Sequence, residues 1–510
     1  MDKNIFKSII SHAKSYGFIF PSSQIYDGLS SVYDYGQQGI MLKNNIKEYW
    51  WKSMVQLHEN IIGFDSAIFV HPNTWKASGH INNFNDFLIE NKDTNHRYRV
   101  DILIENFCKK IQKKVDKELI KAKKKFGSSF NKKEFFYKNM KVKNYIYQIK
   151  NIHFHMNNFI INNNLYGIEK LIKKLNISDP ITGSKNWTTI RKFHLMFGTN
   201  SIQEKCLYLR PETVQGIFIN FSNIHKTSRM KIPFGVAQIG KAFRNEIIAR
   251  QFIFRMREFE QMEMLFFIHP KEEKKWYKYW KHSRLKWHLN LEKDPKKYRF
   301  HDHSNLSHYS RSAVDIEFNF PFGFKELEGI HSRTDFDLKN HEKFSGKNLH
   351  YFDPFLKEKY IPYVIETSLG LDRMFLALLS SSFENEKIRE GKNRIVLKFP
   401  PFLSPIKAGI FPLFKKSGLL EIARNIFNDL KLNYSVIYDE KESIGRRYRR
   451  QDAIGTPICI TVDNKTLKDN CITVRFRDSM KQKRFPINII KIILEKETGI
   501  KKKLKKLCNF

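Results

Sequence analysis

Two stretches between residues 238 and 267 alternate hydrophobic with polar residues, and this pattern predicts an antiparallel hairpin. Side chains along a strand point to alternate faces, so residues two apart share a face. We expect the hairpin to gather arginines, glutamates and an aromatic ring over one surface. The seven residues of matching parity are Arg244, Glu246, Arg255, Arg257, Phe259, Gln261 and Glu263.

Such a surface suits a ligand that combines a polyanion, a flat ring and an ammonium group. The alternative is the solvent-exposed face of an ordinary hairpin. Aromatic residues of the buried type are interleaved here with both signs of charge, whereas a solvated face is typically rich in Lys, Thr and Ser. The mixture therefore favours a binding surface.

Helical spacing of apolar residues predicts a helix over residues 39–58. A short apolar run at 66–70 predicts an edge strand that ends at Pro72. Towards the C-terminus, five alternating runs predict strands, and residues 419–432 predict an amphipathic helix. The five predicted strands are 395–399, 408–414, 434–440, 457–463 and 471–478. Together they describe a small α/β module.

At 510 residues the chain is long enough for two to four domains. Residues 106–176 change character, becoming rich in Lys and Asn, and predict an inserted helical or partly disordered region. We expect four parts, a first part at 1–105, the insertion at 106–176, a core at 177–390 and a C-terminal domain at 391–510.

The chain has 90 Lys and Arg residues against 52 Asp and Glu, a formal net charge of +38. So large an excess indicates a polyanionic partner, with nucleic acid first. The composition is also rich in Asn, Ile and Phe, as AT-biased coding would produce, so compositional drift is an alternative source of part of the charge.

The five cysteines are scattered and form no C-x-x-C pair, which indicates neither a disulfide framework nor a cysteine zinc site. There is no signal-peptide core and no apolar run of about 18 residues. We expect an intracellular, cytoplasmic protein with no membrane partner and no zinc.

Further polar residues lie at element junctions. Glu212 follows Arg210 and Pro211, and Arg99 lies in a basic stretch near the front. Arg373 opens a buried helix, where its guanidinium and the free backbone N–H groups attract phosphate. A structural pairing of Arg373 with Glu366 is the alternative. Glu326 suits a Mg²⁺ contact, with an ordinary surface acid as the alternative.

These residues resemble motifs of the class II aminoacyl-tRNA synthetases. The hairpin resembles motif 2 (F-R-x-E, a loop, then R-x-x-x-F), ETSLGLDR resembles motif 3, and the region ending at Pro72 resembles motif 1. More narrowly, FPSSQIYDGLSSVYDYGQQGIMLKNNIKEYWW, RPETVQGIF, TDFDL and SIGRRYRRQDAIGTP resemble the dimeric, single-chain type of glycyl-tRNA synthetase. The similarity runs in order over nearly the whole chain except the insertion.

The resemblance implies an α+β fold, in which a class II antiparallel sheet is flanked by helices and followed by a C-terminal α/β anticodon-binding domain. It implies a homodimeric glycine–tRNA ligase that uses ATP and Mg²⁺, forms glycyl-adenylate and transfers glycine to the 3′ end of tRNA(Gly). Arg446, Arg447, Arg449 and Arg450 would contact tRNA, with a solvated helix face as the alternative.

The resemblance also assigns site residues. Arg244 would hold the α-phosphate and Arg373 the γ-phosphate as catalytic groups, Phe259 would stack on adenine, Glu246 would read its amine, and Glu326 would contact Mg²⁺. The implied ATP-binding set is Arg244, Asn245, Glu246, Phe254, Arg255, Met256, Arg257, Glu258, Phe259, Glu326, Leu327, Gly370, Leu371, Asp372 and Arg373. The implied glycine-binding set is Arg99, Glu212, Phe259, Glu260, Gln261, Met262, Glu263, Glu366, Thr367, Ser368, Leu369 and Gly370.

Two departures from the family pattern stand out. Thr367 stands where the family usually has Pro, and residues 248–250 replace a motif 2 loop in which Gly or Pro is common. Neither change removes a charged group, so we expect activity. A catalytically inactive nucleic-acid-binding relative, such as a processivity or regulatory subunit, is the alternative. A ligase for serine, threonine or proline is another, and the glutamates argue against it.

Overall fold

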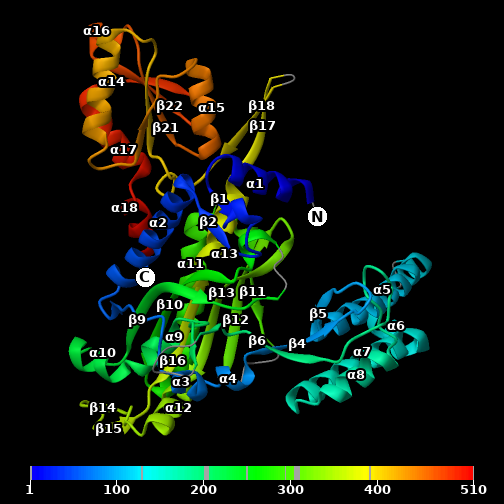
Figure 1. Ribbon diagram of the computed structural model, residues 1–510. Coiled ribbons are helices and arrows are strands. Elements are labelled where there is room, and N and C mark those ends of the chain that lie inside the picture. Colours follow the sequence, from blue (N-terminus) through cyan, green and yellow to red (C-terminus); the bar gives the residue numbers. More distant parts are fainter. Residues whose placement is uncertain are drawn as a thin grey trace. The chain divides into compact units, whose positions relative to one another are not determined.

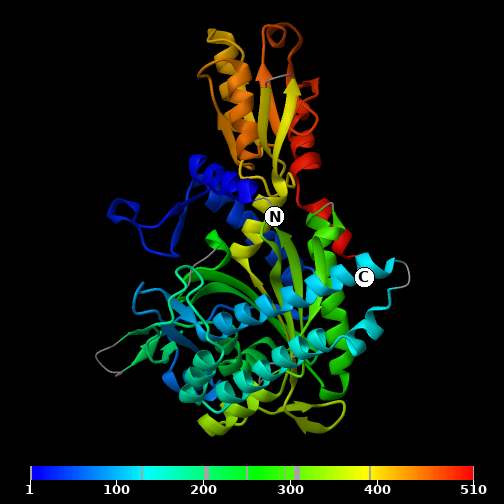
Figure 2. The same ribbon diagram turned by 90° about the vertical axis from the view of Figure 1, so that its right-hand side faces the viewer.

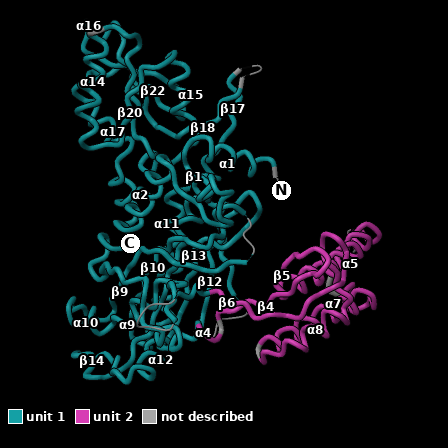
Figure 3. Tube along the Cα trace, viewed as in Figure 1, with its two compact units in different colours: residues 1–80, 196–510 teal, residues 81–195 magenta. Residues whose placement is uncertain are grey.

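The computed structural model describes residues 3–127, 130–199, 206–247, 251–292, 294–303, 310–389 and 392–508. It divides into two compact units, residues 1–80 with 196–510 and residues 81–195 (Figure 3). The second unit encloses the predicted insertion at 106–176 and extends beyond it on both sides. The reason is that strands on either side of the helices pair with one another and close a separate core.

A seven-stranded sheet forms the centre of the first unit (Figure 1). Neighbouring strands are antiparallel throughout, except that β3 lies parallel to β9. In spatial order the strands are β11 (Tyr298–Asp302), β12 (Ser312–Phe320), β13 (Gly323–Thr334), β16 (Tyr363–Gly370), β10 (Glu258–Ile268), β9 (Phe234–Phe243) and β3 (Ile61–Gly63).

One face of this sheet is apolar along its length, because residues of one parity, such as Met262, Met264, Ile330 and Leu369, all point into the main core. Helices cover that face and contribute to the same core. They are α2 (Gln37–Trp51), continued by a π-helical turn at Lys52–Gln56, α11 (Glu273–Leu291) and α13 (Leu371–Ser382).

The opposite face is divided along the strands. Leu265 and Phe267 of β10 join Val364 of β16 in a second core, while the other ends of these strands carry polar residues on the same face. The helices that pack on the apolar half are α9 (Val214–Ile219), α10 (Phe221–Ser228) and α12 (Phe336–Ser345). The polar half is left open to a cavity.

The remaining elements of the first unit up to residue 397 are short connections and hairpins. They are α1 (Lys3–Ser15), β1 (Ile19–Pro21), β2 (Tyr33–Tyr35), α3 (Pro72–Ala77), β7 (Gly198–Thr199), β8 (Leu207–Tyr208), β14 (Tyr351–Asp353), β15 (Glu358–Tyr360), β17 (Phe383–Arg389) and β18 (Lys392–Leu397), with α4 (His80–Asn83) crossing the unit boundary. Among the described residues of this part, four short 3-10 turns lie at Gln24–Tyr26, Phe252–Phe254, Pro270–Glu272 and Pro295–Lys297, and another lies at Ile487–Ile489 in the C-terminal part of the chain.

The C-terminal module has its own five-stranded sheet and its own core (Figure 2). The strand order is β20 (Val436–Tyr438), β19 (Ala408–Pro412), β21 (Ile458–Val462), β22 (Cys471–Phe476) and β23 (Gln482–Pro486). Its helices are α14 (Ser417–Leu430), α15 (Ile444–Ile454), α16 (Thr466–Asp469), α17 (Ile490–Thr498) and α18 (Lys501–Cys508). Four of the five strands and the amphipathic helix predicted from the sequence form here, and β23 is an additional strand. The predicted strand at 395–399 overlaps β18, which pairs with β17 in a separate hairpin.

The second unit is a helical layer with a small sheet. Its sheet, in the order β5, β4, β6, consists of Arg97–Arg99, Asn85–Glu90 and Arg191–His194. Its helices are α5 (Val100–Phe126), α6 (Lys132–Lys138), α7 (Met140–Ile161) and α8 (Leu165–Lys174). The prediction of a helical region is therefore confirmed for its described residues.

The strand predicted at 66–70 does not form, although the helix before it does. Only Phe69 makes an isolated bridge, with Leu209, and the strand that pairs with β9 is instead Ile61–Gly63. The physical reason is Arg210, whose guanidinium Nη1 donates to the carbonyl of Ser66 at 2.8 Å and to that of Ala67. Pro72 begins helix α3.

A buried ionic contact joins helix α11 to strand β13 of the sheet. Glu328 of β13 is fully buried and accepts from Arg284 Nε at 2.6 Å and from His288 Nε2 at 2.6 Å. We expect Glu328→Gln to lower the free energy of unfolding by about 3–5 kcal/mol, because Arg284 would keep its charge without a buried counterion. Chemical denaturation measures this.

The matched control is Glu317→Gln on β12, since Glu317 pairs with the largely exposed Arg299. An exposed pair contributes about 0–1 kcal/mol. Equal losses in both variants would contradict the role assigned to the buried group.

Candidate active site

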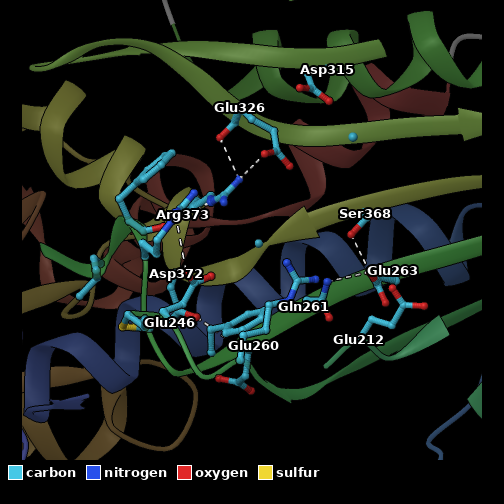
Figure 4. Close-up of a pocket in the computed structure, with 18 of the residues that line it drawn as sticks. Glu212, Glu246, Glu260, Gln261, Glu263, Asp315, Glu326, Ser368, Asp372 and Arg373 are labelled. Atoms are coloured by element: carbon cyan, nitrogen blue, oxygen red, sulfur yellow. Dashed lines mark hydrogen bonds and ion pairs between the residues drawn. The ribbon is translucent and has the colours of Figure 1, made fainter. Parts of the chain in front are cut away.

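A cavity of about 310 Å³ lies on the polar half of the seven-stranded sheet (Figure 4). Strands β10, β13 and β16 form its floor, and the chain before β10 and the start of α13 form its walls. Its lining residues are Glu212, Arg244, Glu246, Ile253, Phe254, Arg255, Met256, Phe259, Glu260, Gln261, Glu263, His303, Asp315, Glu326, Gly329, His331, Glu366, Ser368, Gly370, Asp372 and Arg373.

Strand register brings these residues together from distant parts of the chain. Glu263 on β10 lies opposite Ser368 on β16, and Ser368 lies opposite Gly329 on β13. Residues two positions away on each strand share the same face. The absence of a side chain at Gly329 leaves room for the ring of His331, since a Cβ at position 329 would lie 2.7 Å from that ring.

One end of the cavity is acidic. Glu212, Glu263 and Glu366 converge there, and Glu263 accepts hydrogen bonds from the Ser368 hydroxyl at 2.6 Å and from Gln261 Nε2 at 2.9 Å (Figure 4). The Thr213 hydroxyl also donates to Glu263. Burial, together with the negative charges of Glu366 and Glu212, raises the pKa of Glu263 to about 7.

A buried arginine pairs with one of the other two acids of this end. Arg333 Nη1 lies 2.9 Å from Glu366 Oε2, and Arg333 Nε lies 2.7 Å from Asp337. Burial acts to raise the pKa of Glu212, but His80 and Arg333 lower it well below its usual range. The pKa values of Glu212 and Glu263 are therefore shifted in opposite directions, and Glu263 titrates near neutrality.

The other end of the cavity is basic. Arg373 Nη1 lies 2.9 Å from Glu326 Oε2, and the Arg373 guanidinium carbon lies 4.6 Å from the centre of the Phe254 ring (Figure 4). The Arg244 guanidinium carbon lies 5.3 Å from the centre of the Phe259 ring. Arginines beside flat rings, facing solvent-filled space, suit a ligand with phosphate groups and an aromatic base.

The alternative considered for Arg373, a structural pairing with Glu366, does not form. Arg373 pairs with Glu326, and Glu366 pairs with Arg333, which is 2% exposed. The reason is that both actual partners, Glu326 and Arg333, lie on β13. The order of strands in the sheet places β13 beside β16, and the sequence alone does not show this order. Glu326 lines the cavity, and its side chain is half exposed.

The hairpin forms as predicted, but its strands are shorter than the alternating pattern. Strand β9 ends at Phe243 and β10 begins at Glu258, so Arg244 and Arg255 reach the cavity from the connecting chain. Six of the seven residues of matching parity line the cavity. The exception is Arg257, whose Nε donates to the carbonyl of Glu246 at 3.2 Å. Residues 248–250 lie outside the described residues.

Several residues of the implied sets have side chains that do not line the cavity. Those of the opposite strand parity point into the main core or begin α13, since alternate residues of a strand must face away. They are Met262, Leu327, Thr367, Leu369 and Leu371. The side chain of Asn245 also lies outside the cavity lining, and that of Glu258 pairs with Lys241. The departure at Thr367 thus lies on the core side of β16.

Arg99 belongs to the second unit and is not a lining residue of this cavity. Its guanidinium pairs with Asp86 at 3.1 Å and with Asp101 at 2.8 Å.

Five lining residues were not predicted, namely Ile253, His303, Asp315, Gly329 and His331. His303 Nε2 lies 2.9 Å from Asp315. The only signal in the sequence is strand parity, because Asp315 lies opposite Gly329 and His331 opposite Glu366 in the ladder. Neither pairing is visible without the strand order.

The C-terminal arginines lie on helix α15 and differ in exposure. Arg446 and Arg449 are exposed, and Arg450 pairs with Asp439 and Glu442. Arg447 is 2% exposed, and its Nη1 donates to the carbonyl of Pro412 at 2.7 Å. Arg447 is therefore a buried structural residue, and its assignment as a tRNA contact is wrong.

Within the described part of the chain, no three His, Cys, Asp or Glu side chains gather as a metal-binding group. In the same residues, no helix is both long enough and apolar enough to span a membrane.

Comparison with known proteins agrees with this architecture. Three family models match in succession: "Glycyl-tRNA synthetase insertion domain 1" at residues 86–195, "tRNA synthetase class II core domain (G, H, P, S and T)" at 197–382, and "Anticodon binding domain" at 407–497. The glycine–tRNA ligase of Chlorobaculum tepidum is 46% identical over 93% of this chain and 96% of its own length. The chain belongs to the glycine–tRNA ligase family. The glycine–tRNA ligase of Staphylococcus haemolyticus is 45% identical over 97% of this chain and 99% of its own length.

Two solved structures from Cryptosporidium parvum share the fold at 13% identity. The structure described as the RNA binding domain of threonyl-tRNA synthetase has a TM-score of 0.60, over 96% of this chain and 98% of its own. Prolyl-tRNA synthetase complexed with L-proline and AMP has a TM-score of 0.55, over 98% of this chain and 76% of its own. The expected class II fold, an antiparallel sheet flanked by helices, is confirmed.

The raised pKa of Glu263 has a consequence for stability. The unfolded carboxyl has a pKa of about 4.3, so between that value and about 7 the folded protein binds a proton that the unfolded chain releases. Stability from this group is present at acidic pH and is lost as pH rises through about 7. The Glu263→Gln side chain cannot ionise. We therefore expect the free energy of unfolding of this variant, relative to that of the unaltered chain, to rise by about 3 kcal/mol between pH 5 and pH 8.

Denaturant midpoints of the two proteins, measured across that range, give this difference. A difference that stays constant with pH would show that Glu263 does not titrate near neutrality.

Proposed function

We propose that the cavity activates glycine with ATP and that the chain then transfers the glycyl group to tRNA(Gly). One observation carries this proposal. Three arginines suited to binding phosphate and the three glutamates of the acidic end line a single cavity, in a chain of the glycine–tRNA ligase family. The arginines are Arg244, Arg255 and Arg373, and the glutamates are Glu212, Glu263 and Glu366.

The acidic end suits the ammonium group of glycine. His80 and Arg333 hold the pKa of Glu212 low, and Arg333 pairs with Glu366. Glu263 can release its proton when a cation enters. Ser368 and Gln261 fix the Glu263 carboxylate in place through hydrogen bonds. Carboxylates crowded around the ammonium leave little room for a methyl group. An apolar pocket alone would reject one extra carbon only about 10–200-fold.

The basic end suits ATP. We propose that Arg244 holds the α-phosphate, that Arg373 holds the γ-phosphate and that adenine stacks on Phe259. In the structure Arg373 is paired with Glu326, so phosphate would compete for this guanidinium. Glu326 then faces the cavity as a carboxylate oxygen donor, which fits Mg²⁺ held by one carboxylate and substrate phosphates. When bound, the ion would neutralise phosphate charge.

The proposed reaction has two steps. A carboxylate oxygen of glycine attacks the α-phosphorus of ATP, and pyrophosphate leaves. The terminal ribose hydroxyl of the tRNA then attacks the glycyl carbonyl, and AMP leaves. The arginines stabilise the negative charge that develops on the phosphate oxygens, and positioning provides most of the remaining rate.

The C-terminal module at 391–510 is the proposed site of anticodon binding, with Arg446, Arg449 and Arg450 as tRNA contacts. The exposed guanidinium groups of Arg446 and Arg449 support this assignment. We further propose a homodimer that works in the cytoplasm, where aminoacylated tRNA is used. The catalytic domain then comprises residues 1–80 and 196–390, and the second unit at 81–195 is the insertion between them.

An inactive synthetase-like binding protein is disfavoured, because the arginines for ATP all remain. Ligation of serine, threonine or proline is disfavoured by the three glutamates. Pyrophosphate exchange separates these possibilities. We expect exchange of labelled pyrophosphate into ATP to require glycine and to stay at background with alanine or serine. Background exchange with all three amino acids would overturn the proposed function.

Arg373 gives a second test. We expect Arg373→Ala to lower the exchange rate by about 100-fold or more, because a positive charge at the triphosphate is lost. Binding of tRNA(Gly), measured by filter retention, should stay within about twofold. The control is Lys274→Ala on α11, which removes an exposed positive charge outside the cavity. Loss of tRNA binding together with exchange would indicate misfolding rather than loss of a phosphate contact.

A further inference from the structure

A lysine of helix α2 contacts two residues that line the cavity, although it does not line the cavity itself. Lys43 is 7% exposed, and its Nζ contacts the Glu260 carboxylate and lies 3.5 Å from Asp372 Oδ1. The same Nζ lies 4.1 Å from the centre of the Tyr35 ring. A second lysine, Lys47, lies one turn further along α2 and donates to Glu260 Oε1 at 2.5 Å.

Asp372 is the other centre of this cluster. Its Oδ1 accepts from the Tyr35 hydroxyl, and its Oδ2 accepts from the backbone N–H of Glu260 at 2.8 Å. Tyr35 lies on β2, Lys43 on α2, Glu260 on β10 and Asp372 in the first turn of α13. Three segments that are far apart in the sequence, namely β2 with α2, β10 and α13, therefore meet at two carboxylates.

The charges of the cluster balance, with two lysines against two acids. Burial acts to lower the pKa of Lys43, but Asp372 and Glu260 raise it above its ordinary value. The pKa of Glu260 is lowered, because Lys43 and Lys47 outweigh the effect of burial. The contacts thus hold two lysines against two carboxylates, so the formal charges of the cluster cancel.

Both acids of the cluster also line the cavity, at the end that carries Arg373 (Figure 4). Asp372 immediately precedes Arg373, and Glu260 immediately follows Phe259. An unpaired carboxylate there would repel a triphosphate and compete for the arginines. A shift of Asp372 would also turn the first residues of α13, and Arg373 with them.

We propose that Lys43 is a positioning residue for ATP: it neutralises Asp372 and Glu260 and fixes the start of α13, so that Arg373 faces the phosphates. This inference rests on the proposed function, since it takes the basic end of the cavity to be the ATP site. Lys43 itself does not line the cavity, so its effect passes through the two carboxylates. Glycine binds at the other end and should be little affected.

The test measures the KM values for ATP and for glycine separately in pyrophosphate exchange with the full chain. We expect Lys43→Met to raise the KM for ATP by about 10–100-fold and to leave the KM for glycine within about threefold. Adding Asp372→Asn should recover at least about fivefold of the loss, since it removes the uncompensated charge while its amide group can still bond Tyr35 and the Glu260 N–H. A purely structural role for Lys43 would change both KM values together and would not be rescued.

Two further variants complete the design. Lys52→Met removes an exposed lysine just beyond α2 that pairs with Glu48, and it should leave both KM values unchanged. Tyr35→Phe keeps the ring and removes only the hydroxyl, and it should raise the KM for ATP by about 3–10-fold even if Lys43→Met fails to fold.

An unchanged KM for ATP in Lys43→Met or in Tyr35→Phe would overturn the inference. Failure of the proposed function is distinguishable, because the unaltered chain would then show no glycine-dependent exchange.

Discussion

The register of β16 between β10 and β13 is the constraint on which the site depends. It places Ser368 beside Glu263 on one side and beside Gly329 on the other. Because side chains alternate, a slip of one residue would move Glu366 and Ser368 into the apolar core and bring Leu369 to the cavity. The cores on both faces of the sheet hold this register, since each slip would bury charge and expose apolar surface.

Charge separation within one cavity follows from that register. The strand face that carries Glu263 and Glu366 is acidic, and the basic groups come from chain segments next to the strand ends, at Arg244 and Arg373. A zwitterionic amino acid and a polyphosphate can therefore bind side by side, each at the end that attracts it. The buried Arg333 balances part of the negative charge at the acidic end, because it forms an ion pair with Glu366.

The opposite face of the sheet supports this arrangement through buried polar contacts as well as apolar packing. Glu328 binds Arg284 and His288 of α11, and Lys43 of α2 binds Glu260 and Asp372. Each contact ties a helix to a strand that carries cavity residues on its other side. The helices are thereby fixed in rotation as well as in distance, which apolar packing alone specifies less strictly.

The sequence by itself determined the hairpin, the C-terminal strands, the helix before residue 58 and most cavity residues on β10 and β16, since strand parity and local motifs are local properties. Only the tertiary structure decided that Arg373 pairs with Glu326, that Arg447 is buried and that residues 66–70 form no strand, because Arg210 from a distant segment takes the carbonyls of Ser66 and Ala67. His331, Asp315 and Lys43 likewise gain their place from strand order and helix packing. Such contacts join residues that are far apart along the chain, so no local pattern encodes them.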